Sequence, residues 1–137
     1  MRHFKNIKII LFILGLVFFI GSCENNNKLT NSAIGQTKIF GDLEIAMMDL
    51  PDSLNWKMAI DSCRKLGDGW RVPTKDELNL IYKNKDSISG FAKLFYWSST
   101  ESDTCCAWCF SFSNGYGVKY CNKDNYGYVR PVRTIHK

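Results

Sequence analysis

The sequence predicts a small domain that combines helices with strands, and three segments support this prediction. Residues 108–112 alternate between aromatic rings and small side chains, which is the period of a strand with one buried face. Residues 53–67 and 74–82 carry apolar side chains three and four positions apart, which indicates amphipathic helices. Residues 39–46 alternate loosely and fit a first strand, and residues 83–90 are typical of a polar loop. The length of 137 residues leaves room for one such domain.

Both predicted helices carry signals at their ends. Ser53 can cap the first helix and Gly67 can end it. Cys63 falls on the apolar face of that helix, so we expect a buried thiol there. Thr74 and Glu77 form a capping box at the start of the second helix, which explains the acidic residue better than a catalytic role does.

The predicted strand at 108–112 leads into a region rich in Tyr, Ser, Asn and Gly. Its aromatic rings are expected to face the core, whereas Cys109, Ser111 and Ser113 are expected to face outward. Binding paratopes use these residue types because tyrosine offers a large contact area with few rotatable bonds, and small residues adapt. We therefore predict a ligand-binding surface formed by Asp103, Cys105, Cys106, Cys109, Ser111, Tyr116, Tyr120, Asn122, Asp124, Tyr126 and Tyr128.

The first 22 residues resemble an export signal. Three basic residues precede twelve residues without a charged or polar side chain, a run too short to span a bilayer comfortably. Small residues then precede Cys23, as in the bacterial lipobox, where the cysteine becomes the lipid-modified first residue. We therefore expect a flexible tether at 23–37, a domain at 38–137, and a lipid anchor on a bacterial membrane, namely the outer membrane at the cell surface.

The charge of the chain argues against nucleic acid as a partner. Removal of residues 1–22 lowers the number of Lys and Arg residues from 18 to 15 against 13 acidic residues, which leaves a net charge of about +2. No dense basic stripe remains to contact phosphates.

The cysteines at 105, 106, 109 and 121 allow three interpretations. Cys106 and Cys109 have the spacing of metal ligands, but neighbouring cysteines on a strand point to opposite faces, which disfavours a metal site. Cys109 and Cys121 lie six residues to either side of Gly115 and can form a disulfide across a hairpin, which export permits. The third interpretation, slightly favoured by the sequence, is that the cysteines are incidental surface residues. We therefore predict no metal and no cofactor.

The sequence shows no catalytic arrangement, and we expect no enzyme activity. His3 lies in the export signal and His136 near the end of the chain, so no placed imidazole base is expected. Arg71, Arg130 and Arg133 are expected to form framework ion pairs or to stack on aromatic rings. Calcium-dependent sugar binding is disfavoured because the Glu-Pro-Asn type of motif is missing.

Several motifs in order resemble one bacterial family. They are GWRVPTKDEL (69–78), YWSSTE (96–101), AW-x-F-x-F (107–112) and VRPVR (129–133). Residues 38–133 resemble a domain of unknown function found at the C-terminus of a collagen-like adhesin. That domain is related to secreted domains with a C-type lectin-like fold, including the formylglycine-generating sulfatase activators. The resemblance implies an α+β fold in which two helices pack on a small, twisted, mainly antiparallel sheet with long recognition loops.

The chain departs from the family pattern at one position. Relatives often carry a cysteine in the last strand, where Pro131 stands in this chain, and it bridges to the cysteine of the first helix. The resemblance therefore implies that Cys63 lacks its usual partner, which agrees with a buried thiol.

A narrower resemblance concerns residues 96–133, which look like the variable region of proteins diversified by retroelements. In those systems a reverse transcriptase randomises adenines of AAC codons, which yields Ser, Thr, Asp, Gly, Tyr, Cys and Asn among others. These types fill much of residues 102–128, interrupted by framework aromatics. The resemblance implies a surface-displayed, adhesin-like lipoprotein that binds an unknown protein or glycan. The alternatives are a structural envelope lipoprotein without a dedicated ligand and an enzyme similar to the sulfatase activators.

Overall fold

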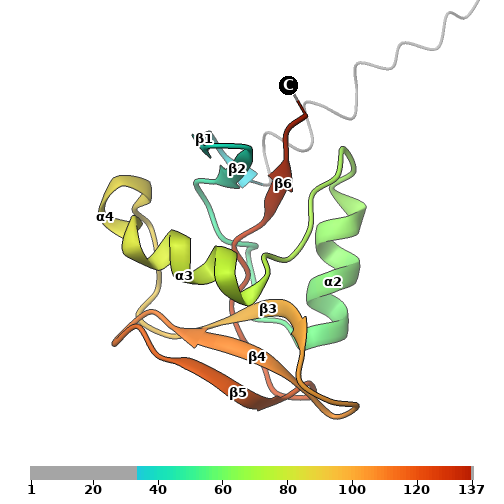
Figure 1. The fold of residues 1–137 in the computed structure, drawn as a ribbon. Helices are drawn as coiled ribbons and strands as arrows, with labels where there is room; N and C mark the ends of the chain where they lie inside the picture. Colours follow the sequence, from blue (N-terminus) through green and yellow to red (C-terminus); the bar gives the residue numbers. More distant parts are fainter. Residues whose placement is uncertain (1–33, 137) are drawn as a thin grey trace, which may run out of the picture.

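A computed structural model describes residues 34–136, and it confirms the predicted α+β fold (Figure 1). Within this range, three helices accompany two small antiparallel sheets, where the sequence led us to expect a single sheet. The elements in chain order are β1 (Thr37–Phe40), β2 (Leu43–Ala46), α2 (Trp56–Lys65), α3 (Lys75–Lys83), α4 (Lys85–Ile88), β3 (Phe95–Glu101), β4 (Cys106–Ser111), β5 (Gly117–Asn122) and β6 (Val132–Thr134).

The predicted export signal and lipidated Cys23 lie outside the described residues, as does most of the tether at 23–37. Packing of the described part begins at Ile34, which is buried in a cluster with Ala46 and Trp70. No helix within residues 34–136 is long and apolar enough to cross a membrane.

The first sheet has the strand order β1–β2–β6. The prediction of one strand over 39–46 was wrong, because Gly41 adopts a positive φ of 62° and turns the chain into a hairpin. All four residues of β2 are buried, so this strand has no exposed face to produce alternation. Strand β6 brings Arg133 beside Glu44, with 2.7 Å between its Nε and a carboxylate oxygen, and the guanidinium lies 4.9 Å from the ring of Trp70. The expected framework role of Arg133 is therefore confirmed.

The second sheet has the order β3–β4–β5, and α3 lies across it (Figure 1). Phe110 and Phe112 are buried as predicted and pack with residues of α3 and β2. The prediction that Cys109 and Ser111 face outward was wrong, since both side chains are buried. Strand β4 lies between its two neighbours and is covered on both faces, so its second face meets protein instead of water.

Trp108 was predicted to lie in the core, but its side chain is more exposed than expected. It is only half buried, and the ammonium of Lys75 lies 4.9 Å from its ring. The indole therefore lies at the margin of the core and forms a cation–π contact there.

Helix α2 begins two residues later than the predicted cap implies. Asn55, and not Ser53, accepts a hydrogen bond from the backbone N–H of Met58, while Gly67 follows the helix with a φ of 73°. Cys63 is a free thiol with no exposed surface, and burial raises the pKa of this thiol to about 12. The expected buried thiol is confirmed.

The capping box of helix α3 is confirmed, with hydrogen bonds running both ways between Thr74 and Glu77. Glu77 also accepts two hydrogen bonds of 2.7 Å from Arg71, which confirms a framework role for that arginine. The segment at 83–90 is not a plain polar loop, because it contains the short helix α4, whose Ile88 is fully buried in the core.

Arg130 joins three parts of the chain from a fully buried position. Its Nε donates to Asp49 at 2.6 Å, and its terminal nitrogens donate to the carbonyl oxygens of Ala46 at 3.1 Å and Gly90 at 2.8 Å. The guanidinium also stacks on Phe91, 3.9 Å from the ring centroid. A buried charge needs this degree of pairing, and the predicted framework role of Arg130 is confirmed.

We predict that Asp49→Ala lowers the free energy of unfolding by about 3–5 kcal/mol, since it leaves the charge of Arg130 buried without a counter-ion. Urea denaturation measures this loss. Asp52→Ala removes an exposed carboxylate nearby in sequence and should change stability by no more than about 0.5 kcal/mol. Equal effects of the two substitutions would contradict the importance of the buried pair.

Glu77 gives the fold a predictable dependence on acid. Burial raises the pKa of this carboxyl, but the hydrogen bonds from Arg71 and Thr74 outweigh burial and hold it below its ordinary value of 4.5. Because the folded pKa is depressed, the stabilisation is complete above pH 4.5 and is lost as the pH falls through the folded pKa. We predict that Glu77→Gln costs about 1–2 kcal/mol at neutral pH and progressively less in acid. Urea denaturation across this pH range tests the prediction, and Asp76→Asn, at an exposed neighbour, is the matched control because it leaves the hydrogen bonds between Arg71 and Glu77 in place.

Candidate functional site

A groove of about 220 Å³ is lined by strand β5, parts of β3 and β4, and the segment 125–127. Three of the residues predicted to contact a ligand, Cys109, Tyr120 and Tyr126, line it. The groove is therefore the place where the fold gathers several of the predicted binding residues around one hollow.

Backbone hydrogen bonds fix the wall formed by the segment 125–127. Gly127 exchanges two hydrogen bonds of 2.9 Å with Leu54, and the N–H of Tyr128 donates to the carbonyl of Phe95 at 2.9 Å. A Cβ atom at Gly127 would lie 3.0 Å from Nε1 of Trp97, so this close approach favours glycine. The wall is held by the main chain and does not depend on the surface side chains that it carries.

A disulfide between Cys109 and Cys121 contributes to the lining of the groove. It joins the neighbouring strands β4 and β5 across 12 residues of sequence, with 6.0 Å between the Cα atoms. For these two cysteines the structure thus confirms the disulfide interpretation. It also rules out a metal site built from Cys106 and Cys109, because the second sulfur is already bonded.

Exposed aromatic and aliphatic side chains form the open part of the groove. Tyr120 is 64% exposed and Tyr126 is 66% exposed, while Phe95 and Val118 are 48% and 38% exposed. Asn125 contributes an amide, and none of the lining residues carries a charge. Such a groove can hold an apolar or aromatic group and offer it hydrogen bonds from phenol and amide.

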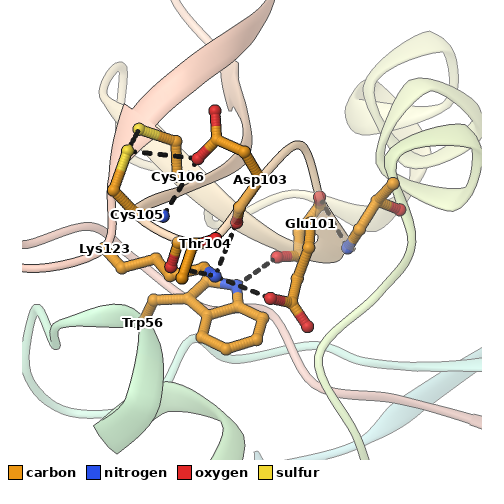
Figure 2. Close-up of polar contacts among 9 residues, drawn as sticks. Trp56, Glu101, Asp103, Thr104, Cys105, Cys106 and Lys123 are labelled. Carbon is orange, nitrogen blue, oxygen red and sulfur yellow. Dashed lines mark hydrogen bonds and ion pairs between the residues drawn. The ribbon is translucent and has the colours of Figure 1, made fainter.

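A second cluster of predicted residues lies in the loop between β3 and β4 and at the first residue of β4 (Figure 2). The thiol of Cys105 lies 3.1 Å from a carboxylate oxygen of Asp103 and 2.7 Å from the sulfur of Cys106. Cys105 is exposed and Cys106 is buried. The expectation that neighbouring cysteines diverge was wrong here, because Cys105 precedes the strand and its side chain is not bound by the strand alternation.

The side chain of Lys123 binds the backbone of this loop. Its ammonium donates to the carbonyl oxygens of Asp103 and Thr104 at 3.0 Å each, and it pairs with Glu101 at 2.6 Å. The same group lies 4.8 Å from the ring of Trp56 (Figure 2). A largely buried cation with these partners fixes the course of the loop.

The contacts within the loop shift two pKa values in opposite directions. A hydrogen bond from the Cys105 thiol lowers the pKa of Asp103. The hydrogen bond with Cys106 and the one to Asp103 raise the pKa of Cys105 to about 12. The neighbouring sulfur and carboxylate thus oppose deprotonation of the Cys105 thiol.

The remaining predicted residues are not part of either cluster. Tyr116, Asn122 and Asp124 are exposed on turns or strand ends outside the groove lining. Ser111 is buried and its hydroxyl lies 2.8 Å from that of Ser113. Tyr128 is half buried instead of exposed, with its ring 5.8 Å from that of Tyr96.

Sequence reasoning missed seven of the ten residues that line the groove, including Phe95, Val118 and Asn125. Val118 and Phe95 are apolar, so the sequence pattern gave no reason to place them at the surface. Asn125 lies in the polar stretch before Gly127 and could have been included from its residue type. Pairing of β3, β4 and β5 positions Phe95 and Val118, whereas Asn125 lies in the turn after β5, where its N–H donates to the carbonyl of Asn122 at 3.0 Å.

The family of this chain follows from its match to a family model. The model of the Lcl C-terminal domain matches residues 24–133, and the chain belongs to this family. No curated protein matches the chain. The predicted resemblance is thereby confirmed as membership of the Lcl C-terminal domain family.

We predict that replacement of Cys109 and Cys121 together by alanine lowers the free energy of unfolding by about 2–4 kcal/mol, because the disulfide restricts the unfolded chain. Urea denaturation of the non-reduced protein measures this change. Cys105→Ser, which alters an exposed cysteine outside this disulfide, should change stability by no more than about 0.5 kcal/mol. A double variant as stable as the wild type would show that the bridge contributes nothing to the fold.

Proposed function

We propose that this Lcl C-terminal domain is a binding module and that its ligand is a protein, which inserts an apolar or aromatic side chain into the groove. The observation that carries this proposal is the uncharged groove flanked by the exposed rings of Tyr120 and Tyr126. Tyrosine rings at the edge of an apolar hollow are common anchors of protein interfaces, since they bury much area at little entropic cost.

The fold supports this proposal because the groove is built on elements that are held in place. The Cys109–Cys121 disulfide, the hydrogen bond from Trp97 to the carbonyl of Leu54 at 2.8 Å and the main-chain bonds of Gly127 all converge on its walls. A preformed surface loses little conformational freedom on binding, which favours affinity.

The uncharged lining favours a protein side chain over a sugar. Sugars present many hydroxyl groups that need polar partners, and Asn125 contributes the only side-chain amide among the lining residues. Apolar rings and a few polar atoms instead match a hydrophobic side chain flanked by backbone amides.

We also propose that the protein is exported and held on the outer membrane by a lipid on Cys23, with the domain displayed at the cell surface. The basic start, the apolar run and the small residues before Cys23 support this localisation. Display without catalysis fits the described residues, in which His136 is the only imidazole and lies exposed near the C-terminal end.

We also propose that a retroelement diversifies residues 102–128. The aromatic residues Phe110 and Phe112 are buried, whereas five of the six residues of β5 are exposed and the residues of the flanking turns are largely exposed. Substitutions could therefore change the surface around the groove and leave the aromatic core intact.

The groove proposal predicts that a double variant, Tyr120→Ala with Tyr126→Ala, loses at least about 2 kcal/mol of binding free energy for its ligands. The probe is a phage-displayed library of random peptides selected on the full chain, and peptides with large apolar side chains should be enriched. Tyr116→Ala is the matched control, because Tyr116 is 71% exposed but does not line the groove. Binding to a glycan array without any peptide enrichment would instead assign the groove to a sugar.

The diversification proposal predicts a near-repeat of the 3′ end of the gene, together with a reverse-transcriptase gene close by. Codons for exposed positions such as Tyr120 and Tyr126 should differ from the repeat only at its adenines, and the codons for Phe110 and Phe112 should match it. Sequencing of the neighbouring DNA decides this point. If no such repeat is present, diversification is excluded and the groove proposal is unaffected.

A further inference from the structure

We propose that Asp103, Cys105 and Cys106 form a binding site for a thiophilic divalent cation of the zinc type. This site is separate from the groove and does not depend on the proposed function, because none of its three residues lines the groove. Its ligands are one carboxylate oxygen and two sulfurs, a set suited to Zn²⁺ and to the softer Cd²⁺.

The three ligand atoms already converge. The carboxylate oxygen of Asp103 and the sulfurs of Cys105 and Cys106 all lie within 4.8 Å of one another. Figure 2 shows both sulfurs on the same side of the loop, next to the carboxylate. A bound cation would displace the protons of both thiols to solvent and bond to the two thiolate sulfurs and the carboxylate oxygen, which already lie in contact.

The loop that carries the ligands is fixed by bonds that do not use them. The N–H groups of Ser102 and Asp103 donate to the carbonyl of Cys106 at 3.0 and 3.2 Å, and the N–H of Lys123 donates to the carbonyl of Cys105 at 3.0 Å. The ammonium of Lys123 binds two further carbonyl oxygens of the loop. The cation would therefore meet a set of ligands whose backbone is already in position.

The adjustment needed for binding is small. Tetrahedral zinc has bonds of about 2.3 Å to sulfur, which places two sulfurs about 3.8 Å apart. The sulfurs lie 2.7 Å apart, so they must separate by about 1 Å, which rotation of the exposed Cys105 side chain can supply. The fourth position is left to water, as in zinc sites with three protein ligands. Charge repulsion from Lys123 is limited because its ammonium is paired with Glu101.

The test uses Cd²⁺ alone, added to the full chain after the two thiols have been shown to be reduced with a thiol-specific reagent. We expect one equivalent of Cd²⁺ to produce a saturable ultraviolet charge-transfer band from thiolate to metal. Cys105→Ser and Cys106→Ser should each weaken the band, and their combination should abolish it. Asp103→Asn should weaken the affinity at least about tenfold, since loss of even outer partners of a metal site commonly costs that much.

Asp124→Asn is the matched control, because it removes an exposed carboxylate from the neighbouring turn without touching the three ligands. Near-ultraviolet circular dichroism of each variant checks that the fold is retained. The proposal is overturned if the reduced wild type gives no band, or if the band persists in the double cysteine variant. It is also overturned if the two cysteines are joined to each other in the protein as isolated, which a mass lower than that of the dithiol form would reveal.

Discussion

The buried ion pair between Arg130 and Asp49 is the constraint on which the rest of the structure depends. A fully buried guanidinium is costly without partners, and here the partners come from the end of β2, from Gly90 in the segment after α4 and from the loop that holds Asp49. Asp49 also accepts a 2.6 Å hydrogen bond from the hydroxyl of Tyr96, which links the pair to β3. The charge of Arg130 thereby links the two sheets and the short helix α4. Arg130 lies only three residues beyond Gly127, which forms part of the groove wall.

Local signals in the sequence were sufficient to predict the two longer helices, α2 and α3. A capping box at Thr74 and Glu77 and a glycine after the first helix act within a few residues, so the chain itself carries the information. The first strand was harder, because the turn at Gly41 joins β1, which is mostly exposed, to β2, whose four residues are all buried, so neither strand alternates. Helix α4 was missed since its single turn has only one buried residue, Ile88, to reveal it.

The candidate site was predicted only in part, and the reason lies in the position of β4. The alternation of aromatic and small residues correctly predicted that Phe110 and Phe112 share a face and lie in the core. It could not tell that the other face of a central strand is also covered, by Trp97, Val129 and helix α2. Cys109 therefore turned out to be buried and bonded. The groove itself depends on long-range pairing, such as that of Gly127 with Leu54, which no local pattern reveals.

This arrangement limits which positions could vary without loss of the fold. Apart from the disulfide-bonded Cys121, the side chains of β5 and of the neighbouring turns are largely exposed, so their exchange changes the surface and little else. At position 111 a large side chain would meet the packed face of β4, because Ser111 is 4% exposed. At position 109 any residue other than cysteine would leave Cys121 without its partner. A framework shared by many binding surfaces must therefore keep these two positions small, even though their residue types resemble those of the exposed ones.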